Sequence, residues 1–232
     1  MSKQNWLVII AGPNGAGKST FYHQILQSDP LFKNAPFVNL DNYAKEMVAQ
    51  NGGTTEDYFI QAGRKVRQSI DNYFKKKKSF VYETTASGLS HLKIMENARN
   101  RGYKVATIFI GLSKVELSHL RVQQRVNEGG HNVSPEDIER RFPKVIKNFP
   151  NMLARSDIAA VFDNSGRTPY KLIFLMDKYH FRVFYTYPRW VKEATKGRNT
   201  SKNFIFVNTN DIKENKKEFF TKIAKQLFLN TK

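Results

Sequence analysis

The sequence predicts an α/β fold built on a doubly wound parallel sheet of about five strands. Short apolar segments alternate along the chain with longer segments whose apolar residues recur at three- and four-residue steps, the spacing of a helix. Strands and helices that alternate in this way are typical of a three-layer fold, with helices on both faces of a parallel sheet. The predicted strands are residues 6–11, 36–41, 79–85, 103–111 and 156–164.

Helices are predicted between these strands from apolar spacing and from residues that start or stop a helix. Helical spacing marks residues 18–28, 42–50, 56–74 and 89–101. The first helix ends before Pro30, because proline disfavours helix at the residue that precedes it. Gly102 is a candidate for the left-handed position after a helix, and Ser134 is a candidate N-cap for a later one.

The chain of 232 residues, 40% of them hydrophobic, is long enough for one such domain with a small addition. We expect a core at residues 1–168, with a helical insert at 42–75 and a lid, followed by a C-terminal α+β extension at 169–232. The extension is predicted to hold a hairpin, a last strand and a closing helix, at 171–177 with 182–187, 204–207 and 211–229.

The composition favours anionic partners. Lysine and arginine number 38 against 20 acidic residues, a net charge of +18, and the pI is near 10.0. Nucleotide phosphates, sugar nucleotides and nucleic acid all fit this charge. The chain has no cysteine, which excludes disulfides and thiolate metal sites. The apolar run at 6–11 is too short for a signal peptide or a membrane span, so we expect a cytoplasmic protein.

The segment from Trp6 to Thr20, WLVIIAGPNGAGKST, carries the strongest functional signal. It fills every fixed position of G-x-x-x-x-G-K-[ST] between an apolar strand and a helix, which predicts a phosphate-binding P-loop. Its glycines let the backbone approach a polyphosphate, Lys18 is expected to reach the β- and γ-phosphates of ATP, and the Ser19 hydroxyl is expected to bind Mg²⁺. The predicted nucleotide-binding residues are Gly12, Pro13, Asn14, Gly15, Ala16, Gly17, Lys18, Ser19 and Thr20.

Two of the predicted strands end in a carboxylate, Asp41 in one and Glu83 in the other. Ligands of open parallel sheets bind beyond the carboxyl ends of the strands, so both acids are expected to face the reacting phosphate. Asp41 has an alternative role as the cap of a helix that begins at Asn42. We favour the functional role, and one residue can serve both.

Four arginines flank a glycine-containing turn at residues 127–132. Arg121 and Arg125 precede the turn, and Arg140 and Arg141 follow it. This composition is typical of a lid that closes over a triphosphate. The alternative is a surface hairpin with solvated arginines.

Asp163 follows the apolar run of the fifth predicted strand. It is a candidate for the magnesium-binding acid of a P-loop protein. A role in a loop that packs near the nucleotide base is an equal alternative.

Together these motifs resemble the zeta-toxin family of small-molecule kinases, in particular its shorter zeta-like branch. A transport ATPase of the ABC type shares the P-loop spelling, but the only near match to its LSGGQ-like segment is TASGL at 85–89, and no apolar run ends in two acids. The resemblance covers about residues 6–168 and rests on GPNGAGKST at 12–20, VNLD at 38–41, AGR at 62–64, YETTASG at 82–88, GYKVATIFIGL at 102–112, RVQQRVNEGGHNVSPEDIERRF at 121–142 and DNSG at 163–166.

The resemblance implies an adenylate-kinase-like core and a kinase that transfers the γ-phosphate of ATP to a hydroxyl of a small molecule. The best-known members of the family phosphorylate UDP-N-acetylglucosamine, and an antitoxin protein is a candidate partner. Asp41 would take the proton of the acceptor hydroxyl. Glu83 would orient the acceptor, and Arg125 would stabilise the transferring phosphoryl group.

The remaining implied site residues lie around these. Thr84 and Arg64 would contact the acceptor, whereas Arg121 and Asn164 would contact the nucleotide. Long zeta toxins place a second catalytic arginine just before the Thr-Pro that opens the next helix. Asn132 and Val133 stand there in this sequence. His131, Arg140 or Arg141 is therefore left to complete the lid, and Arg141 is our choice as the catalytic one.

Two other functions remain as alternatives. The charge of +18 fits a polynucleotide or RNA-end kinase. It also fits a nucleic-acid-binding ATPase that phosphorylates no acceptor.

Overall fold

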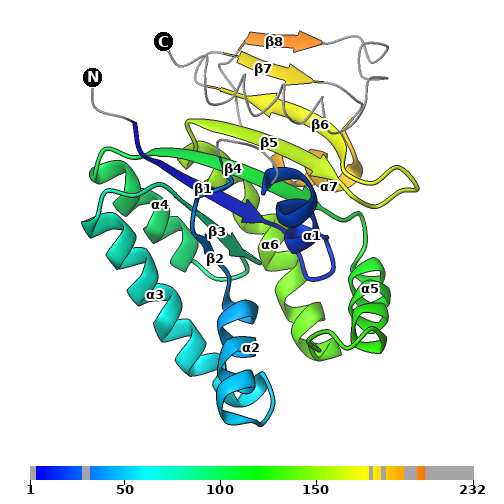
Figure 1. The fold of residues 1–232 in the computed structure, drawn as a ribbon. Coiled ribbons are helices and arrows are strands. Elements are labelled where there is room, and N and C mark those ends of the chain that lie inside the picture. The colour runs from blue at the N-terminus through cyan, green and yellow to red at the C-terminus, as the bar shows by residue number, and fades with distance from the viewer. Residues whose placement is uncertain (1–3, 28–31, 178–179, 184–186, 196–202, 207–232) are drawn as a thin grey trace.

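A single mixed sheet organises the part of the chain that the structure describes (Figure 1). The computed structural model describes residues 4–27, 32–177, 180–183, 187–195 and 203–206. The strands are β1 Trp6–Ala11, β2 Phe37–Val38, β3 Phe80–Thr84, β4 Lys104–Gly111, β5 Ile158–Asp163, β6 Lys171–Met176, β7 His180–Val183 and β8 Asn203–Phe206. Their order in the sheet is β2-β3-β1-β4-β5-β6-β7-β8.

The first five strands of this order pair in parallel, which confirms the predicted doubly wound sheet. β6 adds to β5 antiparallel, and β7 adds to β6 antiparallel, so the predicted hairpin extends the same sheet. β8 then pairs in parallel with β7. The closing helix predicted at 211–229 lies outside the described residues, and the division of the chain at residue 168 stays a prediction.

Helices cover both faces of the sheet. Those of the described residues are α1 Lys18–Phe21, which continues as a π-helical turn at Tyr22–Leu26, α2 Leu40–Asn51, α3 Phe59–Lys75 after a 3₁₀ turn at Glu56–Tyr58, α4 Ser90–Asn100, α5 Val115–Asn127, α6 Pro135–Arg155 and α7 Arg189–Thr195. The apolar sides of α3, α4, α6 and α7 pack on one face, while α1 and its π-helical turn pack on the other.

The helices on both faces of the sheet explain why the sequence of β1 is a continuous apolar run. Leu7, Ile9 and Ala11 belong to the core under α3, α4 and α6, whereas Val8 and Ile10 belong to the core under α1. All five are buried. A central strand covered on both sides has no solvent-facing position, so it lacks the alternation of a surface strand.

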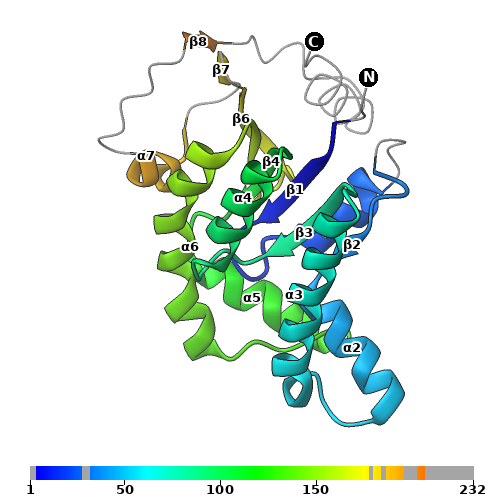
Figure 2. The ribbon, with the colours of Figure 1, turned by 90° about the vertical axis from the view of Figure 1, so that its left-hand side faces the viewer.

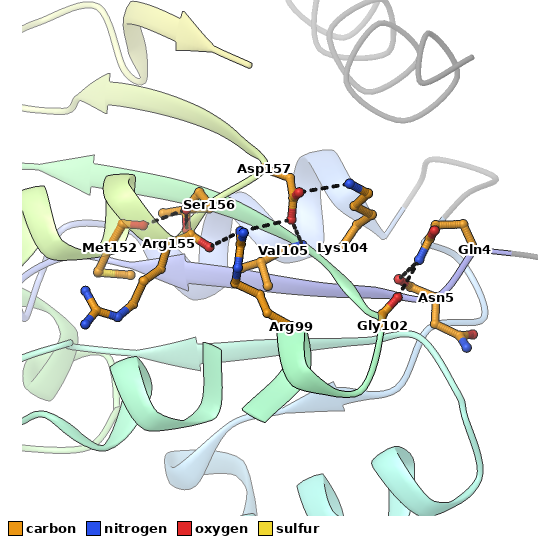
Figure 3. Close-up of polar contacts among 11 residues, drawn as sticks. Gln4, Asn5, Arg99, Gly102, Lys104, Val105, Met152, Arg155, Ser156 and Asp157 are labelled. Atoms are coloured by element: carbon orange, nitrogen blue, oxygen red, sulfur yellow. Dashed lines mark hydrogen bonds and ion pairs between the residues drawn. The ribbon is translucent and has the colours of Figure 1, made fainter. Parts of the chain in front are cut away.

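Polar contacts fix the amino edge of the sheet, away from the P-loop (Figure 3). The Asp157 carboxylate accepts from the Val105 N–H at 2.8 Å and from Lys104 Nζ at 3.0 Å. Arg99 donates to the Arg155 carbonyl oxygen at 3.2 Å. The start of β4 is therefore tied to the residue that precedes β5, and the end of α4 is tied to the end of α6.

Trp190, on α7, joins the C-terminal segment to the parallel sheet. Its ring packs on Gly111 so closely that a Cβ there would lie 2.2 Å from a ring carbon. Its Nε1–H donates to Asp163 Oδ1 at 3.2 Å. The end of β4 therefore needs glycine at position 111, because any side chain would displace the tryptophan.

Two helix pairs extend below the sheet in the view of Figure 2. One consists of α2 and the start of α3, both within the helical insert predicted at 42–75 apart from the first two residues of α2. The other consists of α5 and the start of α6, and the segment that joins them runs toward α3 (Figure 2). Within the described residues, no helix is long and apolar enough to cross a membrane.

We expect the buried His91, on α4, to make stability depend on pH. Its Nε2 has no hydrogen-bond partner, and burial together with the nearby Arg155 charge lowers its pKa to about 4 from 6.5. Between pH 6.5 and about 4 the unfolded chain binds a proton that the folded protein does not. The free energy of unfolding should therefore fall by up to about 3 kcal/mol as the pH drops through this range.

Urea titrations of His91→Leu and of the exposed-site control His23→Leu test this expectation. The His91 variant should lose this part of the pH dependence, and the control should keep it. A wild-type slope indistinguishable from that of His91→Leu would show that the histidine does not carry the effect.

Candidate active site

The P-loop, residues 12–19, connects β1 to α1 at the carboxyl edge of the parallel strands. Gly12 and Gly17 have φ of 151° and 88°, a range that L side chains rarely adopt. A Cβ on Gly12 would lie 2.0 Å from the Ile110 carbonyl oxygen, and one on Gly17 would lie 2.8 Å from the Tyr170 hydroxyl. The loop is therefore packed against its surroundings at two points where only glycine fits.

Asn164 and Tyr170, which follow β5, hold the P-loop from behind. Asn164 Nδ2 donates to the Ala16 carbonyl oxygen at 3.0 Å, and the Tyr170 hydroxyl donates to the Gly17 carbonyl oxygen at 2.9 Å. The Tyr170 N–H donates in turn to Asn164 Oδ1 at 3.1 Å. The loop thus receives two hydrogen bonds from a segment about 150 residues later in the chain.

Arg121, on α5, completes this support. Its guanidinium donates to the Asn164 carbonyl oxygen at 2.6 Å and to the Gly15 carbonyl oxygen at 3.4 Å. Arg121 and Asn164 were both predicted to bind the nucleotide. The structure places them against the P-loop backbone, and a direct contact of either with the nucleotide stays a prediction.

Lys18 is the buried cation of this region. It is 7% exposed, and its Nζ donates to the Pro13 carbonyl oxygen at 2.9 Å. Burial lowers the pKa of Lys18, whereas the negative charges of Glu83 and Asp41 oppose that shift and the positive charge of Arg125 adds to it. Three predicted site residues therefore interact electrostatically with the P-loop lysine.

Glu83 lies near the end of β3, the strand beside β1. The Ser19 hydroxyl lies 2.9 and 3.1 Å from its two carboxylate oxygens, and the Asn39 side chain also hydrogen-bonds to this carboxylate. Burial raises the pKa of Glu83, and Lys18, Ser19 and Asn39 partly offset that effect. The acid predicted to orient the acceptor thus contacts the residue predicted to bind magnesium.

Asp41 lies in the first turn of α2, where the sequence predicted the end of a strand. β2 is only two residues long, and α2 begins at residue 40. The cap is Asn39, whose Oδ1 accepts from the Asn42 N–H at 3.0 Å. The alternative that Asp41 caps this helix is therefore wrong, because Asn39 takes that position and starts the helix two residues earlier.

Arg125, on α5, carries two buried nitrogens, Nε and one terminal nitrogen, that have no hydrogen-bond partner. Gly130 packs over the side chain. Its N–H donates to the Arg125 carbonyl oxygen at 2.8 Å, and a Cβ on Gly130 would lie 2.5 Å from Arg125 Cγ. Because a buried guanidinium without an acceptor is costly, these nitrogens fit an anion that binds beside Lys18.

His131 joins the lid segment to the insert. Its Nδ1 lies 2.9 Å from the Thr55 hydroxyl and 3.4 Å from Glu56 Oε1, and its ring contacts Phe59 edge-on with centroids 5.0 Å apart. Burial lowers the pKa of His131, and the negative charges of Asp41 and Glu56 oppose this shift. The segments predicted as the lid and the insert therefore meet at one buried histidine.

Arg140 and Arg141 both pair with Asp137 in the first turn of α6. The predicted N-cap Ser134 is confirmed, since its hydroxyl oxygen accepts from the Asp137 N–H at 3.2 Å. Arg141, predicted to be catalytic, is therefore held by a carboxylate of its own helix. A role for it in the reaction stays a prediction.

Three further residues are placed by the structure. Arg64 is exposed on α3, and Thr84 uses its hydroxyl oxygen to accept from the Ala86 N–H at 3.1 Å. Acceptor contacts by either stay predictions. Asp163 accepts from Ser165 at 2.6 Å and lies on β5, which β4 separates from β1. Of the two acids Asp163 and Glu83, Glu83 is the one that contacts Ser19, the serine predicted to bind magnesium.

Magnesium is bound in P-loop enzymes by a few protein oxygens together with substrate phosphates. The Ser19 hydroxyl and the Glu83 carboxylate form an oxygen pair of this kind. Among the described residues, no group of three or more His, Asp or Glu side chains is arranged to hold a metal ion. The site therefore fits a metal that arrives with a phosphate ligand.

The sequence matches the zeta toxin family over residues 1–170. The chain belongs to this family. One relative is an uncharacterized protein of Haemophilus influenzae. It is 30% identical over 139 residues, which make up 60% of this chain and 94% of the relative. The predicted relationship to the zeta toxins is confirmed.

Solved structures share the fold of this zeta toxin family member. The AvrRxo1-ORF1:ORF2 structure with ATP matches with a TM-score of 0.64 and 16% identity, over 75% of this chain and 59% of that chain. The PezAT toxin-antitoxin system of Streptococcus pneumoniae matches with a TM-score of 0.53 and 22% identity, over 70% and 68%. The present chain thus spans less than two thirds of the AvrRxo1 chain. Family and fold together support a nucleotide-binding P-loop kinase.

We expect Tyr170→Phe to weaken ATP binding about fivefold, because one hydrogen bond that supports the P-loop is lost. The matched control is Tyr103→Phe, which removes a hydroxyl that donates to backbone oxygens of Tyr73 and Lys78 away from the P-loop. Isothermal titration calorimetry with ATP and Mg²⁺ should show weaker ATP binding in Tyr170→Phe and unchanged binding in Tyr103→Phe. Equal dissociation constants for Tyr170→Phe and wild type would contradict the supporting role of this hydroxyl.

Proposed function

We propose that this protein is an ATP-dependent kinase that transfers the γ-phosphate to a hydroxyl of a small molecule, with a UDP-amino sugar as the first acceptor class to test. The observation that carries the proposal is the pair of buried, unpartnered nitrogens on Arg125, whose charge acts on the P-loop lysine. Arg125 has two unpaired buried nitrogens and interacts electrostatically with Lys18, and Asp41 interacts with the same lysine. Two cations and one carboxylate at one P-loop are the groups that phosphoryl transfer requires.

On the donor side, Lys18 exchanges its bond to the Pro13 carbonyl for phosphate oxygens. Ser19 and Glu83 would hold magnesium, which when bound neutralises charge on the phosphates. The P-loop amides cradle the phosphates, in a conformation supported by Asn164 and Tyr170. These groups place the donor rigidly, and positioning is the main contribution a protein makes to this reaction.

On the acceptor side, Asp41 accepts the proton of the attacking hydroxyl. Its position in the first turn of α2 puts it on the helical insert, which meets the lid through His131. Arg125 bonds the equatorial oxygens of the transferring group, where negative charge is spread in the transition state. Gly130 keeps the Arg125 side chain in place.

We assign the completion of the lid to His131. Arg140 and Arg141 are engaged by Asp137, whereas His131 interacts with Asp41 and Arg125 and contacts the insert at Thr55. In the proposed enzyme it closes the lid over the acceptor. An antitoxin is a proposed partner, since PezAT is a toxin-antitoxin system.

Asp41→Asn should lower the rate of acceptor phosphorylation by about a hundredfold or more and leave ATP binding intact, because only the proton acceptor is lost. Radiolabelled ATP with UDP-N-acetylglucosamine, and in parallel with a metabolite extract, provides the assay. Asp71→Asn, an exposed acid on α3, is the control and should behave like wild type. Product formation that Asp41→Asn leaves unchanged would remove Asp41 as the base.

Gly130→Ala should lower kcat by about a hundredfold, because its Cβ would move Arg125 away from the transferring group. Affinity for ATP should change little. Glu128→Ala, in the same segment but exposed, controls for a general disturbance of the lid. If kcat of Gly130→Ala matches that of Glu128→Ala, Gly130 does not position the arginine.

The charge of +18 favours a second candidate, a kinase for polynucleotide ends. It predicts labelling of 5′-hydroxyl oligonucleotides that falls steeply with salt. Labelling of UDP-N-acetylglucosamine without labelling of oligonucleotides would exclude it. ATP hydrolysis stimulated by nucleic acid, with no labelled acceptor, would instead favour a nucleic-acid-binding ATPase.

A further inference from the structure

The loop between β3 and α4, residues 84–88, has a strained backbone at the candidate site. Ala86 has a φ of 58°, the left-handed region that costs a residue with a Cβ free energy. Its side chain is nevertheless buried in the main hydrophobic core. The loop follows Glu83, whose carboxylate contacts the P-loop serine. A strained conformation at this place needs contacts that hold it.

Asn148, on α6, supplies such contacts. Its Nδ2 donates to the Ala86 carbonyl oxygen at 2.8 Å and to the Gly88 carbonyl oxygen at 2.9 Å. The asparagine is 7% exposed and sits on a helix 60 residues away in sequence. Both of these hydrogen bonds go to backbone oxygens of the loop, so the Asn148 amide holds the loop in its shape.

The fixed loop carries two hydroxyls that interact with each other, on the residues that follow Glu83 and Thr84 in the chain. Thr85 Oγ1 and Ser87 Oγ lie 3.2 Å apart and are half-buried. Thr84 accepts from the Ala86 N–H and closes the turn from the other side. If Ala86 relaxed to an ordinary negative φ, the backbone after Thr85 would change direction, and the Thr85 and Ser87 hydroxyls would lose their present arrangement.

We propose that Asn148 is a positioning residue for the acceptor side of the site. It holds the 84–88 loop in the shape in which Ala86 has a left-handed backbone conformation. This inference rests on the proposed kinase function. A polar, hydroxylated acceptor that lies beside Glu83 is then bound by a surface whose shape depends on α6. Asn148 acts through the loop, so its loss affects acceptor binding and leaves the donor side unchanged.

Asn148→Leu, which keeps the side-chain size and removes both donors, tests the proposal with UDP-N-acetylglucosamine as the acceptor probe. We expect KM for this probe to rise about tenfold, with the dissociation constant for ATP within about twofold of wild type. Adding Ala86→Gly should restore most of the acceptor KM, because glycine adopts the positive φ without help. Ser156→Ala, which removes a buried hydroxyl at the C-cap of the same helix, should leave KM unchanged.

Amide hydrogen exchange gives a readout that needs no acceptor. Residues 85–88 should exchange faster in Asn148→Leu and slow again in the double variant, while the P-loop amides stay as in wild type. Unchanged exchange of the loop would overturn the proposal, as would an equal weakening of ATP and acceptor binding or a failure of Ala86→Gly to restore KM. If wild type does not phosphorylate UDP-N-acetylglucosamine, that acceptor class is wrong, and the exchange measurement still decides whether Asn148 holds the loop.

Discussion

The burial of Lys18 is the constraint on which the rest of the site depends. An ammonium group removed from water is costly unless oxygen atoms and opposite charges compensate it. The structure supplies the Pro13 carbonyl at 2.9 Å and the negative charges of Glu83 and Asp41. Burial lowers the pKa of Lys18 and raises that of Glu83, so burial disfavours the charged form of both groups. A bound polyphosphate would stabilise the charged lysine, and its metal ion would stabilise the charged glutamate. The site is thus arranged for a ligand that is itself strongly charged.

In the proposed kinase, the two sides of the P-loop have different functions. Behind it, Asn164 and Tyr170 hold backbone carbonyls in a fixed position, which keeps the glycine conformations without contacting the reacting groups. In front of it, the insert and the lid meet at His131, and the 84–88 loop is held by Asn148. A rigid donor half and an acceptor half assembled from several helices would let related chains keep the same chemistry and change the acceptor.

The sequence was sufficient for the parallel sheet and the P-loop because both depend on local patterns. Apolar runs located the four longer parallel strands, and fixed spacing located Lys18 and Ser19. Asp41 was misplaced because a two-residue strand carries almost no pattern and Asn39 competes as the cap. The supports of the site were not predictable for another reason. The bond from Asn164 to Ala16 spans 148 residues, and no periodicity or motif signals a contact of that kind.

The most direct test of the account is a crystal structure with ADP, magnesium and aluminium fluoride, a mimic of the transferring phosphoryl group. We expect the two unpaired nitrogens of Arg125 to bond the fluoride ligands, and the Asp41 carboxylate to face the aluminium from the side opposite ADP. An Arg125 turned away from the mimic, with Asp41 on the nucleotide side of it, would contradict the proposed transfer.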